Sequence, residues 1–122
     1  MENDFDNLLK IQHLLLNNGN IPVNKGLLYK FGANAAIMYS ELLYEAIYYY
    51  GNNRTTKEGY FYSTISNIEK TIYLSRKEQD RAINKLIEGG LIEKKLKGIP
   101  PKRHFKILTN IDEIKNILFE PS

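Results

Sequence analysis

The segment 75–106 holds the residues of this sequence whose types and spacing are best suited to binding an anion. It contains ten Lys and Arg residues against four acidic ones, a net charge of +6, whereas the rest of the chain is −3. The whole chain, with 122 residues and a net charge of +3, is only mildly basic. Basic charge concentrated in one part of a chain indicates a polyanionic partner, and the alternative is a solvated charge run.

Other kinds of chemistry have little support in the residue pattern. His13 and His104 lie far apart and the chain has no cysteine, so we expect no metal site and no disulfide. Glu41 and Glu45 are spaced like an acid/base pair, but they fit better as the exposed stripe of a helix. Nucleotide-binding and nucleophile motifs are absent from the sequence. We therefore expect that the chain is not an enzyme and that it binds no cofactor and no small-molecule substrate.

The length and composition are those of one ordinary globular domain, 1–122, with 43% hydrophobic and 25% charged residues. No window approaches ~18 consecutive apolar residues, so we expect no membrane segment. The acidic start, Met1 to Asp4, leads into no apolar signal core. These features predict a cytoplasmic protein.

Two helices are expected in the first half of the chain. Residues 4–18 place apolar side chains at helical spacing, and a connector containing Pro22 follows. Residues 33–50 should form a helix that is apolar nearly all round and ends in three tyrosines. Such a helix is either the central core helix or has one face covered by another subunit.

The second half of the sequence predicts shorter helices and strands with clear start and stop signals. A strand at 60–62 precedes a short helix capped by Ser63 or Thr64. A helix over 75–89 starts with an S-x-x-E capping box and ends at a pair of glycines. Its inward stripe is Ala82, Ile83, Leu86 and Ile87. Strands at 91–96 and 104–108 and a last helix at 111–119, with Ile114, Ile117 and Leu118 inward, complete the chain.

This order of elements is characteristic of the winged helix-turn-helix, in which the second helix of the pair enters the DNA major groove. We therefore predict a mainly α fold with a small β-hairpin, a winged helix-turn-helix with extra N- and C-terminal helices. Residues 4–32 would be the N-terminal helix and connector, 33–108 the winged-helix core and 109–122 the C-terminal helix.

The predicted partner is double-stranded DNA, bound through the recognition helix 75–89 and a proline-stiffened wing, 97–103. Arg81 and Asn84 have the donor geometry for guanine and adenine edges. Asp80 either accepts from cytosine or orients a neighbouring arginine. The candidate DNA-binding residues are Arg76, Lys77, Gln79, Asp80, Arg81, Asn84, Lys85, Lys97, Lys102 and Arg103.

The stretches "LSRK", "AINKLIEGGLIE" and "KGIPPKRHFKI" lie within 60–107, a segment that resembles the winged-helix N-terminal domains of Gram-positive plasmid replication initiators and phage replisome organisers. Winged-helix transcription regulators share part of this pattern. The resemblance implies that Arg76, Lys77, Arg81 and Asn84 lie on the recognition helix and Lys102 and Arg103 on the wing. It implies a role in replication initiation or in transcription regulation.

Two departures from the family pattern leave alternatives open. Position 79 is usually apolar, so Gln79 is either half-buried or turned toward DNA. The plasmid initiators carry further domains, so this chain corresponds to a fragment or to a small stand-alone regulator. The alternative function is a protein–protein interaction module that uses the tyrosine-rich helix 33–50, with a homodimer as one outcome.

Overall fold

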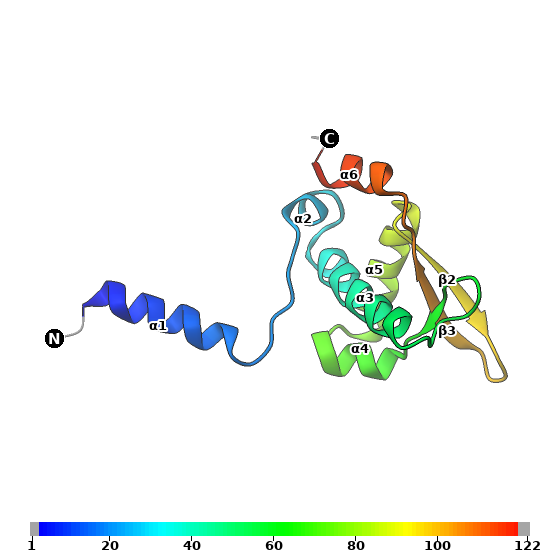
Figure 1. Cartoon of the computed structure of the whole chain (residues 1–122), viewed down its shortest axis with the longest axis horizontal. Helices are drawn as coiled ribbons and strands as arrows, with labels where there is room; N and C mark the ends of the chain where they lie inside the picture. Colours follow the sequence, from blue (N-terminus) through cyan, green and yellow to red (C-terminus); the bar gives the residue numbers. More distant parts are fainter. Residues whose placement is uncertain (1–2, 120–122) are drawn as a thin grey trace.

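The computed structural model describes residues 3–119. The expected domain limits, 1 and 122, and the first two residues of the acidic start lie outside this range. The chain folds into six helices and three strands (Figure 1). Their order is α1 (Asp4–Leu16), α2 (Lys25–Phe31), α3 (Ala33–Gly51), β1 (Phe61–Tyr62), α4 (Ile65–Ile72), α5 (Arg76–Glu88), β2 (Ile92–Lys97), β3 (Lys102–Ile107) and α6 (Ile111–Phe119). This is the predicted winged helix-turn-helix with additional helices at both ends.

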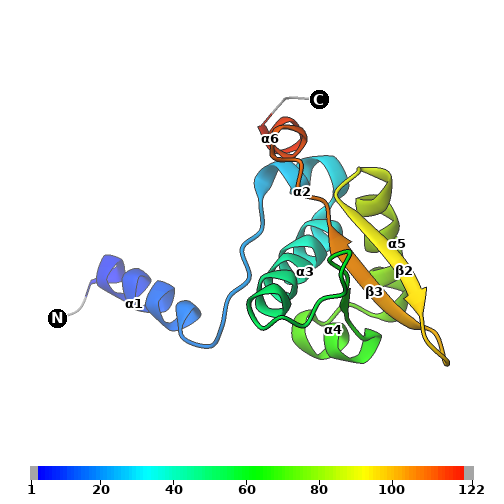
Figure 2. The same ribbon diagram turned by 45° about the vertical axis from the view of Figure 1, so that its right-hand side comes forward.

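The sheet has three antiparallel strands in the order β1-β3-β2. Strands β2 and β3 form the predicted hairpin, and β1 adds a short third strand on the other side of β3. The register places Phe61 opposite Phe105 and Ile92 opposite Ile107, so these apolar residues share one face. Helices α3 and α5 pack against the sheet, whereas α1 lies apart from it (Figure 2).

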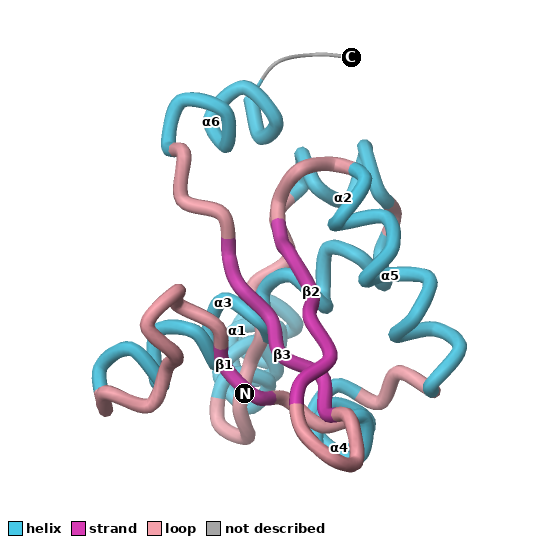
Figure 3. Tube along the Cα trace, turned by 90° about the vertical axis from the view of Figure 1, so that its right-hand side faces the viewer, coloured by secondary structure: helices cyan, strands magenta, loops and turns pink. Residues whose placement is uncertain are grey.

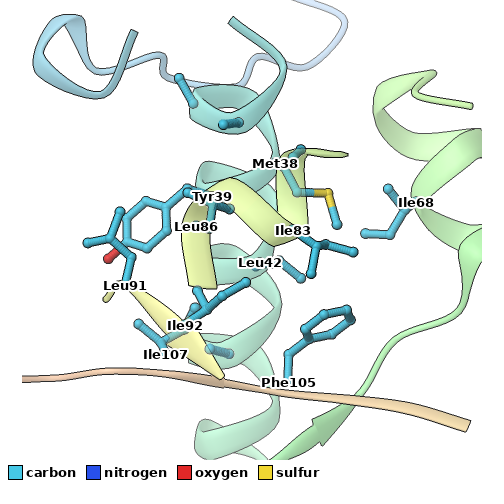
Figure 4. Close-up of a cluster of buried hydrophobic side chains, with 14 of the residues drawn as sticks. Met38, Tyr39, Leu42, Ile68, Ile83, Leu86, Leu91, Ile92, Phe105 and Ile107 are labelled. Atoms are coloured by element: carbon cyan, nitrogen blue, oxygen red, sulfur yellow. The ribbon is translucent and has the colours of Figure 1, made fainter. Parts of the chain in front are cut away.

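Helix α3 is the central core helix, as its all-round apolar sequence predicted. Met38 and Leu42 of α3 are fully buried and lie among apolar side chains from α4, α5 and the sheet (Figure 4). Ile68, Ile83 and Phe105 are among these side chains. Burial of these large side chains holds the helix-turn-helix against the sheet.

The helix-turn-helix is defined by local signals that the sequence contains. Thr64 caps α4 by accepting a hydrogen bond from the Asn67 amide at 2.9 Å. Tyr73 ends α4 in the left-handed conformation, with φ at 59°. The predicted capping box of α5 is present, because Ser75 and Glu78 each accept a hydrogen bond from the other's backbone amide.

Helix α2 was not expected, because the connector was predicted to run to residue 32. Asn24 caps this helix by accepting from the Leu27 amide at 3.0 Å. The helix has seven residues, too few for a clear periodic signal, and is stabilised by packing against α3 and α6. Gly26 allows the close approach to α6, since a Cβ there would contact the backbone carbonyl of Leu118. The inward residues predicted for α6, including Leu118, do pack against the core.

Helix α1 forms as predicted but extends away from the rest of the molecule (Figure 1). None of its residues is buried, and Phe5, Leu15 and Leu16 are each more than 60% exposed. The apolar stripe seen in the sequence therefore has no packing partner within residues 3–119.

Candidate nucleic-acid interface

Helix α5 separates its side chains into a buried and an exposed face. Ala82, Ile83 and Leu86 are buried, as their spacing predicted. Ile87 was also predicted to point inward, and this is wrong, because it lies at the edge of the stripe and is 38% exposed. The opposite face is exposed and carries charged and amide groups. It consists of Arg76, Lys77, Asp80, Arg81 and Asn84, and we call it the α5 face.

Gln79 was predicted to contact DNA, and this is wrong, because its side chain is completely buried. Its amide nitrogen donates to the carbonyls of Leu74 at 2.9 Å and Ile65 at 3.1 Å. These bonds hold the end of the turn and the start of α4 against α5. The amide fits a position that is usually apolar because its hydrogen bonds offset the cost of burial.

Arg103 was also predicted to contact DNA, and it too is buried, with 9% of its surface exposed. The alternation along β3 directs it to the inner face of the sheet together with Phe105, whose ring centroid lies 5.2 Å from the guanidinium. Nη2 donates to Gln79 Oε1 at 3.0 Å, and Nε donates to the Ser63 carbonyl at 3.4 Å. Burial lowers the pKa of Arg103, against the opposing effect of Asp80 and Glu45.

Glu41 and Glu45 were expected on an exposed stripe, but both are buried. Ser63 Oγ donates to Glu45 Oε1 at 2.8 Å. Burial, followed by the neighbouring Glu41, raises the pKa of Glu45 to about 8. We call this group, which joins α3, α5 and β3, the buried polar cluster: Glu41, Glu45, Ser63, Gln79 and Arg103.

Two further predicted contact residues on α5, Asp80 and Lys85, each interact with another part of the protein. Asp80 is exposed, and its charge raises the pKa of the buried Arg103, whereas Arg76 lowers it. Lys85 lies near the other end of the helix, where its ammonium donates to the Phe31 carbonyl at 3.2 Å. This bond satisfies a carbonyl at the end of α2 and directs Lys85 away from the α5 face.

The wing is a hairpin turn at 98–101 between β2 and β3. Gly98 has φ at 93°, which glycine adopts without strain, and the Ile99–Pro100 peptide is cis. Ile99 at the tip is fully exposed. Lys97 and Lys102 are paired across the two strands at the base of the turn. Each ammonium lies over a tyrosine ring of the outer sheet surface rather than at the tip.

Among the residues of that surface that were absent from the predicted set are Tyr62, Lys95, His104 and Lys106. They lie on β1, β2 and β3, next to Lys97 and Lys102. The period-two alternation of 102–107 could have separated these residues from the buried Arg103. It could not have placed β1 beside β3, because that pairing joins distant parts of the chain.

Between residues 3 and 119, no three His, Cys, Asp or Glu side chains are grouped so that they could hold a metal ion. Over the same residues, no helix is both long and apolar enough to cross a membrane.

Comparison with known proteins shows similarity of structure rather than of sequence. No family model and no curated protein matches the chain. A solved structure described as the N-terminal domain of a DNA-binding protein matches 90% of this chain and 94% of its own, with a TM-score of 0.61 and 12% identity. A second, described as a Rep–DNA complex, matches 90% of this chain and 95% of its own with the same score and identity. The chain therefore has the fold of these winged-helix-like N-terminal domains.

Proposed function

We propose that this chain is a single, non-catalytic winged-helix domain that binds double-stranded DNA in a sequence-specific manner. The observation that carries this proposal is the α5 face, a capped helix surface with three cations and one amide beside a basic hairpin. The similarity to a Rep–DNA complex supports the same partner. The cellular role that fits both the family resemblance and this neighbour is plasmid or phage replication initiation, with transcription regulation as the alternative.

In the proposed complex, the α5 face enters the major groove. Arg81 would donate to a guanine edge and Asn84 would pair with an adenine edge. Arg76 and Lys77, in the first turn, would contact bases or phosphates. Asp80 repels phosphate, which disfavours binding that is independent of sequence.

The wing would lie along the sugar-phosphate backbone beside that groove. Lys97 and Lys102 remain candidates for this contact, because their ammonium groups lie on the surface at the base of the turn. Gln79 and Arg103 are removed from the contact set, since both are buried. Lys85 is engaged with α2 and is a weaker candidate.

Selection of bound sites from random duplexes, followed by fluorescence anisotropy on the selected and scrambled duplexes, tests this proposal. Binding to the selected duplex should weaken with salt, with a log–log slope of about −0.9 for each phosphate neutralised. Equal affinity for the selected and scrambled duplexes would contradict sequence-specific recognition. A palindromic selected site would indicate a dimer on DNA.

A second candidate function, protein–protein interaction or homodimer formation, is favoured by the exposed side of α3. Tyr44 and Ile47 are 68% and 66% exposed, and Leu43 and Tyr48 lie beside them. These four side chains recur at helical spacing and form one apolar surface. Tyr49 does not belong to this surface, because its ring stacks on Phe61 with centroids 5.8 Å apart.

Sedimentation velocity on wild type and on Tyr44→Ala tests this second function. Self-association through α3 should be weakened by Tyr44→Ala, whereas Tyr73→Ala, which removes another highly exposed tyrosine, serves as the control. A monomer at all concentrations would argue against the homodimer. DNA binding and dimer formation are compatible. Protein–protein interaction would therefore be the sole function only if the wild-type chain did not bind DNA.

A further inference from the structure

The outer surface of the sheet has a composition different from that of its inner surface. On β3, Arg103, Phe105 and Ile107 are buried, so the alternate residues Lys102, His104 and Lys106 face the other way. Figure 3 looks onto the three strands from the side opposite the helices. We call this surface the outer sheet face; its members are Tyr60, Tyr62, Glu93, Lys95, Lys97, Lys102, His104 and Lys106.

The register brings the outward residues of the three strands together. Tyr62 on β1 is opposite His104 on β3, and Lys95 on β2 is opposite the same histidine. Lys97 is opposite Lys102. An aromatic pair, Tyr62 on the edge strand β1 and His104 on the central strand β3, therefore lies beside the lysines of β2 and β3.

The lysines are held over the aromatic rings. Lys95, Lys97 and Lys106 place their ammonium groups 4.6, 5.3 and 5.9 Å from the centroid of Tyr60. Tyr60 is only 3% exposed, so its ring orders the ammonium groups and is not open to a ligand.

The carboxylates near the outer sheet face offset only part of this positive charge. Glu93 accepts a hydrogen bond from the Tyr60 hydroxyl at 2.6 Å, and this bond raises the pKa of Tyr60 to about 12. Glu58 lies in the turn before β1. Hydrogen bonds to its own backbone and to the Thr56 side chain are the main causes that lower its pKa, and the nearby charges of Lys97 and Lys95 lower it further. Four lysines against these two carboxylates leave a positive face, suited to an anionic ligand.

Tyr62 provides the second kind of contact that this face can make. Its side chain is 39% exposed, and its ring centroid lies 5.6 Å from that of His104 at an angle of 36°. Lys102 lies 5.2 Å from the same ring. An exposed aromatic ring on a sheet surface, flanked by cations, can stack on an unpaired base while the cations contact its phosphates.

We propose that the outer sheet face binds a single strand of nucleic acid, with a base stacked on Tyr62 and the adjacent phosphates contacted by Lys95 and Lys102. Bases within a duplex are already stacked on one another and offer no free face to the tyrosine ring. Helix α5 packs on the inner side of the sheet, so the α5 face and the outer sheet face are separate surfaces. The outer sheet face shares Lys97 and Lys102 with the wing contact proposed above, whereas Tyr62 and Lys95 take no part in the proposed duplex binding.

Fluorescence anisotropy with labelled oligothymidylate and oligouridylate of about 15 nucleotides, near the upper site size of known single-strand modules, tests the proposal on the full chain. Tyr62→Ala should weaken binding by about 5- to 100-fold, the loss expected for one stacked base. Tyr62→Phe keeps the ring and should retain the affinity. Lys95→Glu should also weaken binding, whereas Arg81→Ala should weaken binding to the selected duplex only.

Three outcomes would overturn the inference. If neither oligonucleotide binds at low salt, the face has no single-strand function, and the duplex measurement on the same sample reports separately on the α5 face. If Tyr62→Ala and Tyr62→Phe both bind like wild type, the lysines attract any polyanion and no base stacks there. If Arg81→Ala removes single-strand binding, the strand occupies α5. A preference between the two oligonucleotides identifies the ligand as DNA or RNA and leaves the inference intact.

Discussion

Arg103 on β3 and Gln79 on α5 are hydrogen-bonded to each other in the interior, with 3.0 Å between Nη2 and Oε1. The same glutamine donates to the backbone before α5 and at the start of α4. One buried amide therefore connects β3, the helix-turn-helix turn and α5. We infer that this contact sets how the wing is placed relative to the α5 face, although neither residue reaches the surface.

Arg103→Met should destabilise the fold, because it leaves the buried Gln79 Oε1 and the Ser63 carbonyl without their donor. A loss of about 1–3 kcal/mol is expected for such unsatisfied groups. Lys102→Met, on the neighbouring exposed position of the same strand, should stay within about 0.5 kcal/mol of wild type. Urea denaturation followed by circular dichroism measures both free energies of unfolding. Similar losses for the two variants would show that Arg103 has no special role in the interior.

Arg81→Ala and Lys102→Ala should differ in their effects on duplex binding. Arg81→Ala should cost about 1–3 kcal/mol of discrimination at one base position, because a base-edge contact is lost. Lys102→Ala should weaken all sequences alike and reduce the salt slope by about 1. Anisotropy on duplexes substituted one base pair at a time, at several salt concentrations, separates the two effects. A uniform loss for both variants would indicate that α5 contacts only the backbone.

Stability should depend on pH through Glu45. Because its pKa is raised to about 8 in the fold, Glu45 holds a proton in the folded state over a range where the unfolded carboxyl has lost it. The folded state then binds more protons, so its stability falls as pH rises from about 4.5 to 8, by at most about 1.4 kcal/mol per pH unit. Glu45→Gln should remove this fall, which urea denaturation over a pH series can measure.

The control for this pH dependence is Glu69→Gln, which changes an exposed carboxylate on α4. Its stability should fall between pH 5 and 8 as that of wild type does. A Glu45→Gln profile with the same slope as wild type would mean that another group is responsible.

Gly89→Ala should destabilise the junction between α5 and α2. A Cβ at this position would lie 2.6 Å from Cζ of the Phe31 ring, although the backbone, with φ at −76°, tolerates any residue. We expect a cost of about 1–3 kcal/mol, typical of overpacking. Phe31→Leu should relieve the clash, so the double variant should recover part of the loss in thermal or urea unfolding.

Gly51→Ala is the matched control for this prediction, since a Cβ there meets nothing within 4 Å. It lies at the end of α3 and should be neutral or stabilise by up to about 1 kcal/mol, because alanine has the higher helix propensity. Equal behaviour of the two variants would show that contact with Phe31 is not what requires glycine at position 89.

Much of the fold could be predicted from the sequence, because its signals are local. The Ser75 capping box, the stop at the Gly89–Gly90 pair, where Gly90 has φ at 77°, and the stripe of Ile83 and Leu86 depend on neighbours within a few residues. Each therefore acts in the same way whatever the rest of the chain does. The exposed positions on α5, Arg81 and Asn84 among them, followed from that stripe.

The tertiary structure alone decided which polar side chains point inward and which surfaces remain open. Gln and Arg are residue types that usually lie at the surface. Gln79 and Arg103 gain buried partners only because β3 pairs with β1 and α5 packs on the sheet. The same pairing brings Tyr62 beside His104 from forty-two positions away in the sequence. Helix α1 formed as its spacing predicted, but whether its leucines are covered depends on a neighbouring surface. Periodicity specifies a face, whereas burial requires a second surface that distant residues must supply.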